Sequence, residues 1–139
     1  MQNLILWIDD QPVRSLILNG MLGNRLFEED VPIVIMAYGY EQVDYYLSDN
    51  FPFYRNIKMI ICDHDMFGFD GMEVCMTFLR DNLHLPIILC SANIEGIEKQ
   101  YEYLMGSTNV EKRIYKIPIM YKDFYEKVVV IYKGTLKNA

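Results

Sequence analysis

The apolar residues of this chain alternate between short apolar runs and stretches with helical spacing. Short runs rich in Ile, Val and Leu are typical of strands that are covered on both faces of a sheet. These runs are residues 4–8, 31–37, 57–62, 87–90 and 114–117. After each run, apolar residues recur three or four positions apart, which predicts helices that begin near Pro12, Tyr40, Met72, Ile94 and Tyr121. In the first helix, this spacing predicts an apolar face made of Val13, Leu16, Ile17 and Met21.

Strands that alternate with helices through short connections predict an α/β fold. Such connections produce a parallel sheet with helices on both faces and right-handed crossovers. We therefore expect a doubly wound, five-stranded parallel sheet in the order 2-1-3-4-5, the flavodoxin-like (βα)5 arrangement, as a single domain over residues 1–139. In that order the ligand crevice lies at the carboxyl ends of the first and third strands.

The composition excludes several functional classes. Of the 139 residues, 52% are hydrophobic, and the formal net charge is −6. A negative chain without a basic stripe argues against direct binding of nucleic acid. No apolar run approaches the roughly 20 residues of a membrane span, and the start lacks the basic region of a secretory signal. Cys62, Cys75 and Cys90 lie in apolar segments, which predicts buried, reduced thiols and a cytoplasmic location.

Acidic residues follow the two strands that border the predicted crevice. Asp9 and Asp10 follow the first run, and Asp63 follows the third. Clustered carboxylates repel one another unless a cation is present, and Mg²⁺ prefers oxygen ligands of this kind. A carboxylate in such a cluster can attack a phosphoryl group and form an aspartyl phosphate, which needs donors and cations around the phosphoryl oxygens. Ser91 and Lys116 end the fourth and fifth runs with a hydroxyl and an ammonium group.

In this order, the residues resemble the receiver domain of two-component response regulators. That family has an acidic pair after the first strand, an acceptor Asp after the third, Ser or Thr after the fourth and Lys after the fifth. Here the matching positions are Asp9, Asp10, Asp63, Ser91 and Lys116, and the resemblance covers essentially the whole chain.

The resemblance implies a Mg²⁺ site and a role for each matching residue. Asp10 and Asp63 would bind the metal directly, with the backbone carbonyl of Asp65 as the third protein ligand. Asp9 would act on the metal mainly through water. Ser91 would bond a phosphoryl oxygen after phosphorylation.

The position of Lys116 departs from the family pattern. The resemblance implies that this lysine pairs with Asp63 and later with the phosphate. In the family, a proline with a cis bond usually follows the lysine directly, whereas here Ile117 lies between Lys116 and Pro118. Either the strand has slipped by one residue, which would put Ile117 at the lysine position, or the cis bond has moved to Pro118. A slip by one residue sends side chains to the opposite face of the sheet.

The resemblance implies a signalling function and not an enzyme with turnover. Asp63 would accept a phosphoryl group from a histidine kinase or a phosphotransfer protein in a Mg²⁺-dependent reaction, with autodephosphorylation as a further reaction. The last two helices and the fifth strand would then form the output face, toward an unknown downstream protein or a second copy in a homodimer. Tyrosines favour such an interface. The tyrosines expected on this face are Tyr101, Tyr103, Tyr125 and Tyr132.

Two other functions remain open at this point. One is a pseudo-receiver, a protein-interaction module with the same fold that is never phosphorylated. The other is a haloacid-dehalogenase-like phosphatase, because Asp63 and Asp65 resemble the nucleophile and acid of that family. The acidic pair Asp9 and Asp10 would then be unexplained, although both could simply favour the first turn of the following helix. Ser91 could likewise be a helix cap.

Overall fold

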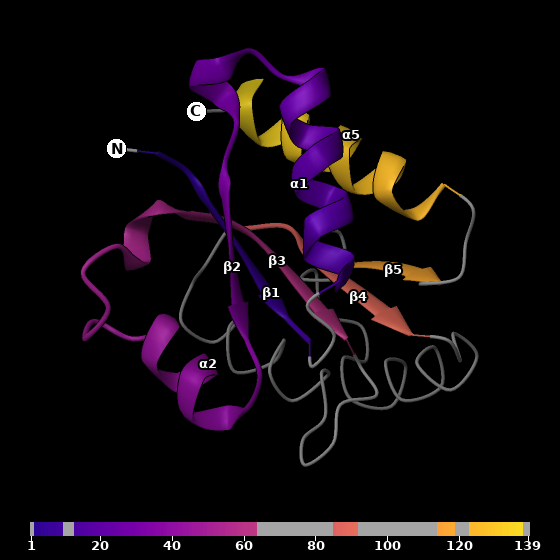
Figure 1. Ribbon diagram of the computed structural model, residues 1–139. Coiled ribbons are helices and arrows are strands. Elements are labelled where there is room, and N and C mark those ends of the chain that lie inside the picture. Colours follow the sequence, from indigo (N-terminus) through magenta and orange to yellow (C-terminus); the bar gives the residue numbers. More distant parts are fainter. Residues whose placement is uncertain (1, 10–12, 64–84, 92–113, 119–122, 138–139) are drawn as a thin grey trace.

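A five-stranded parallel sheet forms the centre of the molecule (Figure 1). The structure is a computed structural model that describes residues 2–9, 13–63, 85–91, 114–118 and 123–137. The strands are β1 (Leu4–Ile8), β2 (Ile33–Ala37), β3 (Ile57–Asp63), β4 (Ile87–Ser91) and β5 (Ile114–Pro118). Their order in the sheet is β2-β1-β3-β4-β5, so β1 and β3 are neighbours near its centre.

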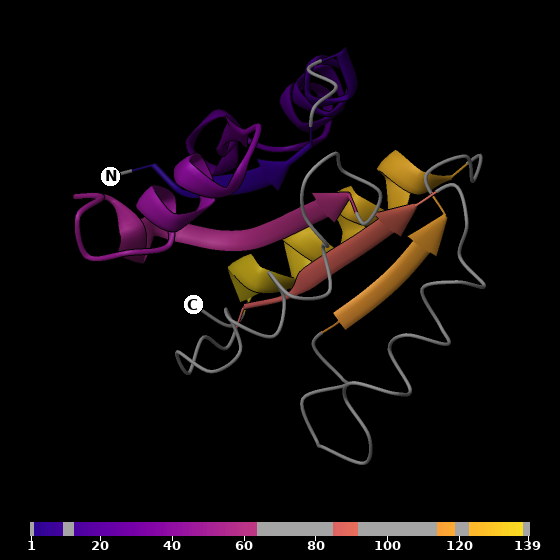
Figure 2. The same ribbon diagram turned by 90° about the horizontal axis from the view of Figure 1, so that it is seen from below.

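The described helices cover both faces of this sheet. They are α1 (Val13–Arg25), α2 (Tyr40–Tyr46) and α5 (Phe124–Lys137), with short 3₁₀ turns at Glu28–Asp30 and Tyr54–Asn56. Helices α1 and α5 contact each other on one face, and α2 lies on the other (Figures 1 and 2). The helices expected near Met72 and Ile94 lie outside the described residues. The predicted α/β class with a parallel sheet is confirmed.

The side chains of β1 show how the two faces are filled. Because successive residues of a strand point to opposite faces, alternate positions separate into two cores. Leu6 packs in the core beneath α2, whereas Ile5 and Trp7 pack in the core beneath α1 and α5. All three side chains are completely buried, which explains why the strand reads as one continuous apolar run.

One register shift determines which face the acidic end of β3 reaches. Lys58 is an extra residue relative to β1 and lies between Ile57 and Met59. Because of this bulge, each following residue points to the face of the sheet opposite to the one it would reach without the extra residue. Met59 and Ile61 therefore pack in the core beneath α1 and α5, and Asp63 continues the same series.

The predicted apolar face of α1 is wrong at three of its four residues, whereas the fourth, Met21, packs against the core beneath α1 and α5. Val13, Leu16 and Ile17 are 62%, 67% and 46% exposed, and the helix instead packs through its alternative stripe. The buried residues of α1 are Ser15, Leu18 and Leu22. Apolar residues lie on several sides of this helix, so two different sets of residues with helical spacing could form the packed face. The set that packs includes the polar Ser15, which made it harder to recognise in the sequence.

Tyr132 also differs from its predicted place on an output face. It is completely buried, and its hydroxyl donates to the Asp30 carbonyl at 3.2 Å and accepts from Asn3 Nδ2 at 3.2 Å. The expectation of an interface role for this tyrosine is therefore wrong, because its polar tip is satisfied inside the fold. Tyr125 on the same helix is only partly buried, and Tyr101 and Tyr103 lie outside the described residues.

The predicted burial of the cysteines is confirmed for two of them. Cys62 and Cys90 are buried, while Cys75 lies outside the described residues. In the part of the chain that the structure describes, no helix has the length and apolar character needed to cross a membrane.

Candidate functional site

Two carboxylates meet at the carboxyl ends of the central strands. Asp63 is the last residue of β3, and Asp9 directly follows β1, its paired neighbour. The backbone N–H of Asp9 donates to the Ala37 carbonyl at 3.1 Å, which continues the β1–β2 pairing by one residue and holds Asp9 in place. Asp9 and Asp63 follow Trp7 and Ile61 by two positions, so both belong to the face that α1 covers.

A single arginine contacts both carboxylates. Nη1 of Arg14, in the first turn of α1, lies 2.9 Å from Asp9 Oδ2 and 3.5 Å from Asp63 Oδ2. The first contact is a good charge-assisted hydrogen bond, and the second is at the long limit of one. The Asp9 side chain is completely buried, whereas those of Asp63 and Arg14 are 12% and 29% exposed. Asp63 is therefore the carboxylate that solvent can reach.

The buried Asp9 carboxylate has a second donor. Trp7 Nε1 donates to the same Asp9 Oδ2 atom at 3.2 Å. The indole ring also packs against Phe124 of α5, with ring centroids 6.3 Å apart. Trp7 therefore connects the acidic site to the helix that covers this face of the sheet.

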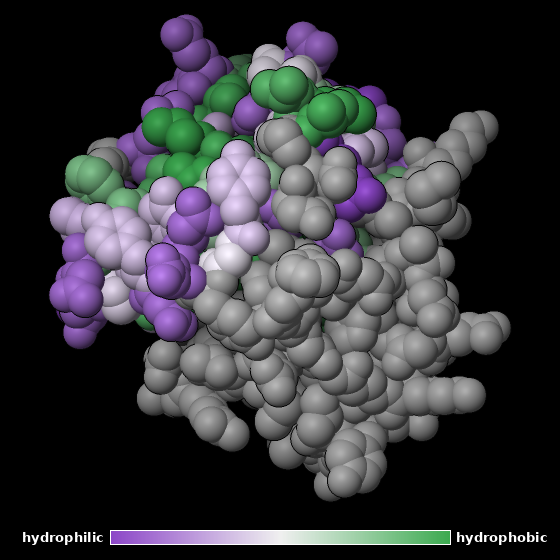
Figure 3. All heavy atoms as spheres, turned by 60° about the horizontal axis from the view of Figure 1, so that its bottom comes forward, coloured by the Kyte–Doolittle hydropathy of each residue, from purple (hydrophilic) through white to green (hydrophobic). Residues whose placement is uncertain are grey.

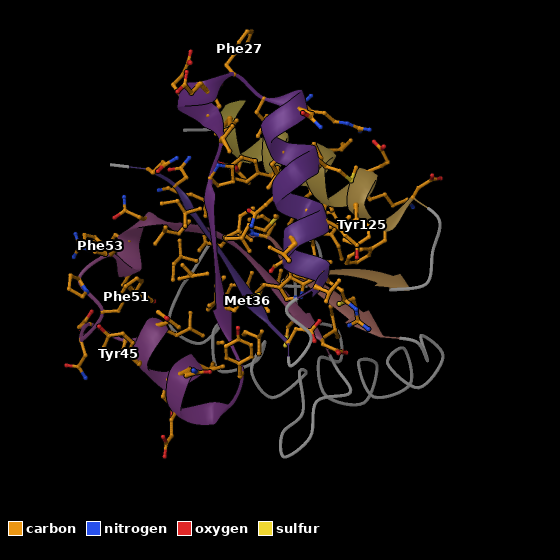
Figure 4. All side chains as sticks on the ribbon, in the orientation of Figure 1. Phe27, Met36, Tyr45, Phe51, Phe53 and Tyr125 are labelled. Carbon is orange, nitrogen blue, oxygen red and sulfur yellow. The ribbon has the colours of Figure 1, made fainter. Side chains whose placement is uncertain are left out.

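The charges of the site act on the pKa values of Arg14 and Tyr125. Burial by itself would lower the pKa of Arg14, but attraction by Asp9, a hydrogen bond to it and attraction by Asp63 outweigh burial and raise that pKa. Burial raises the pKa of Tyr125, while the positive charge of Arg14 lowers it in part. Figure 4 shows Tyr125 on α5 beside α1, at the margin of the site.

The described part of the site fits a cation. Oδ2 of Asp9 and Oδ2 of Asp63 both lie within 3.5 Å of one positively charged nitrogen, so these oxygens already converge on a point of positive charge. Carboxylate oxygens are the donors that Mg²⁺ prefers. Within the described residues no group of three His, Cys, Asp or Glu side chains lies together, but the predicted ligands Asp10 and Asp65 are outside them.

The fourth and fifth strands reach the same edge of the sheet. Asp63 pairs with Cys90 in β4, and Cys90 pairs with Ile117 in β5. Lys116 pairs with Leu89, one position earlier. Ile117 is thus the residue level with Asp63 across the sheet. The side chains of Ser91 and Lys116 lie outside the described residues, so their predicted contacts with the phosphate and with Asp63 stay predictions.

The sequence analysis missed Arg14 and the polar role of Trp7. The available signal for Arg14 was its place in the first turn of the helix after the acidic pair, where a long cationic side chain can reach back to a strand end. Trp7 lies within an apolar run, and nothing in the sequence around it indicated that its indole N–H forms a hydrogen bond.

Comparisons with known proteins bear on the fold of the chain. No protein-family model matches the chain. It is 30% identical over 63 residues to the heme response regulator HssR of two Staphylococcus epidermidis strains. The match covers 45% of this chain and 28% of each relative, so the chain matches less than a third of their length.

Solved structures match almost the whole chain. A response regulator receiver domain protein from Clostridium thermocellum has a TM-score of 0.70 at 14% identity, covering 98% of this chain and 95% of that one. A receiver domain from Francisella has a TM-score of 0.63 at 17% identity, covering 96% and 99%. The response regulator TrrA from Thermotoga maritima, solved with Mg²⁺ and BeF, has a TM-score of 0.57 at 20% identity, covering 94% and 99%. These likenesses establish the fold.

Proposed function

From the receiver-domain fold of this chain, we propose that Asp63 accepts a phosphoryl group in a Mg²⁺-dependent reaction. The observation that carries this proposal is the position of Asp63. It ends a central strand beside the buried Asp9, and its own carboxylate is 12% exposed. A rigid strand thus delivers one accessible carboxylate to the edge of the sheet where ligands bind in α/β folds.

The proposed chemistry uses Asp63 as a nucleophile. One oxygen of its carboxylate forms a bond to phosphorus while the bond from phosphorus to the donor atom breaks, and the donor keeps the electron pair. When bound, Mg²⁺ would neutralise the charge that develops on the phosphoryl oxygens. Asp63 would hold it together with Asp10 and the carbonyl of Asp65, with Asp9 acting through water. The family pattern further assigns Ser91 and Lys116 to the phosphoryl oxygens.

The proposed donor is a histidine kinase or a phosphotransfer protein. The proposed location of the chain is the cytoplasm. Such a donor has to bring its phosphohistidine to Asp63, so it must contact the margin of the site. Val13, Leu16 and Ile17 offer an exposed apolar surface on the helix that carries Arg14. Figure 3 shows that apolar side chains, in green, gather in the upper part of that view.

The proposed output is a protein contact that depends on phosphorylation. Self-association through the last two helices and the fifth strand is one form of it, and Tyr125 is the described tyrosine that is not fully buried in α5. Sedimentation with and without beryllofluoride tests this form, because a mass that never changes would exclude a homodimer. In either form the chain acts as a stoichiometric acceptor and not as an enzyme with turnover.

Phosphoryl acceptance has a direct test in mass spectrometry. The protein is incubated with acetyl phosphate and Mg²⁺, and we expect the added mass of one phosphoryl group. Asp63→Asn and removal of the metal with EDTA should both abolish the addition. Asp44→Asn is the matched control, because Asp44 is an exposed aspartate on α2, and it should label like the original protein.

Two results would contradict this function. Labelling that survives Asp63→Asn would show that the acceptor is a different residue. A complete lack of labelling in the original protein would favour the pseudo-receiver, an interaction module that is never phosphorylated. Steady turnover of a phosphomonoester would instead indicate a phosphatase.

A further inference from the structure

The acidic site has a cation of its own. In the structure, one guanidinium nitrogen of Arg14 contacts the buried Asp9 and the acceptor Asp63 together. Two adjacent carboxylates on one face of a sheet repel each other, and burying such a charge is costly unless it is paired. The ion pair with Arg14 offsets both costs.

We propose that Arg14 is the resident counter-ion of this site, which a divalent metal has to displace from Asp9 and Asp63 before it can bind. This inference rests on the proposed function only in assigning the metal to these carboxylates. It predicts that Arg14 stabilises the protein without metal and weakens its affinity for Mg²⁺. Arg14 is thus a positioning residue that sets the metal concentration at which the acceptor is ready.

The placement of Arg14 allows this exchange. Its side chain extends from the first turn of α1 and is 29% exposed, so water reaches part of it. The contact to Asp63 is 3.5 Å, against 2.9 Å for Asp9, so the bond to the acceptor is the weaker of the two. Displacement from Asp63 therefore requires only a side-chain movement.

The register of the fifth strand adds to this assignment. Lys116 pairs with Leu89, and Ile117 takes the position level with Asp63 through Cys90. The position from which a lysine would be expected to approach the acceptor thus holds an isoleucine. Arg14 supplies a positive charge to Asp63 from the helix on the covering face.

The test is a Mg²⁺ titration in the absence of any phosphodonor. Trp7 is the single tryptophan of the chain and donates to the same Asp9 oxygen as Arg14, so its fluorescence reports on the exchange. In Arg14→Met, the Mg²⁺ concentration at half-saturation should fall by about tenfold, because one repelling charge is removed at a distance of a few ångströms. The melting temperature without metal should fall in the same variant.

Two further variants separate this role from a general effect of charge. Arg14→Lys keeps a cation near the site, so its half-saturation should stay within about threefold of the original protein. Arg25→Met removes the same charge from the other end of α1, where Arg25 pairs with Glu126 of α5, and its Mg²⁺ response should not change. Arg14→Gln replaces the Met variant if that protein does not fold.

The possible results are easy to tell apart. An unchanged or weaker Mg²⁺ affinity in Arg14→Met, or an equal change in Arg25→Met, overturns the proposal. So does a failure of all variants to bind Mg²⁺. None of these results depends on phosphoryl transfer. A protein that passes this titration but is not labelled by acetyl phosphate would refute the proposed function and leave the role of Arg14 intact.

Discussion

At the scale of single residues, the oxygen Oδ2 of Asp9 has two hydrogen-bond donors among the described residues. It accepts from Trp7 Nε1 and from Arg14 Nη1, and the carboxylate is completely buried. Each donor offsets part of the cost of burying the charge. The indole N–H therefore contributes to stability as well as packing, in a position that the sequence presents as purely apolar.

We expect Trp7→Phe to lower the free energy of unfolding by more than its loss of volume explains. A hydrogen bond to a charged group contributes about 1.5–3 kcal/mol, and this contribution should fall when Asp9 is replaced by the neutral asparagine. Urea unfolding of Trp7→Phe, Asp9→Asn and the double variant measures the coupling between the two residues. A coupling energy near zero would mean that the hydrogen bond does not stabilise the fold.

Sequence reasoning placed Asp9 and Asp63 together because their positions follow from strand ends alone. Asp9 and Asp63 come directly at the ends of apolar runs, and neighbouring parallel strands bring such ends together. The reach of Arg14 could not be deduced in this way. It depends on how α1 lies on the sheet, and no pattern of apolar residues determines where a long side chain ends.

At the scale of elements, the strands were more predictable than the helix faces. Parallel strands buried on both faces must be apolar throughout, so β1 and β4 were located to within a residue. Helix α1 is apolar on several sides, so spacing alone could not decide between its two stripes. The stripe that packs contains Leu18 and Leu22, which belong to one core with residues of β1 and α5.

The two stripes of α1 make opposite predictions for substitution by alanine. Leu18→Ala should cost about 2–5 kcal/mol of unfolding free energy, because it leaves a cavity in the core. Leu16→Ala, at a 67% exposed residue two positions earlier, should change stability by less than about 0.5 kcal/mol. Chemical denaturation of both variants measures the difference. A larger loss for Leu16→Ala than for Leu18→Ala would mean that the helix packs through the predicted stripe after all.

At the scale of the whole molecule, Tyr132 joins parts that are distant in the chain. Its hydroxyl connects α5 to Asn3 before β1 and to Asp30 before β2. Burial raises its pKa above the ordinary value of 10, a hydrogen bond from Asn3 lowers it in part, and the charge of Asp30 raises it. The folded protein therefore holds the phenol proton more tightly than the unfolded chain does.

This tyrosine should make the fold sensitive to alkali. Because the pKa is higher in the folded state, its contribution to stability is complete below about pH 10 and is lost as the pH rises through the folded value. Tyr132→Phe should cost about 1–2 kcal/mol near neutral pH through its lost hydrogen bonds. The same variant should lose less stability between neutral and alkaline pH, which denaturation at several pH values measures. A parallel pH dependence in both proteins would contradict this role.

The order of the strands also has a consequence for synthesis on the ribosome. The adjacent strands β2, β1 and β3 all lie within the first 63 residues, so three of the five strands can pair early. The face that carries Trp7, however, needs Phe124 and Val128 from α5. At roughly 5–20 residues per second, translation of the roughly 60 residues in between takes about 3–12 seconds. For that time part of an apolar face remains uncovered on the nascent chain, where a chaperone can bind it.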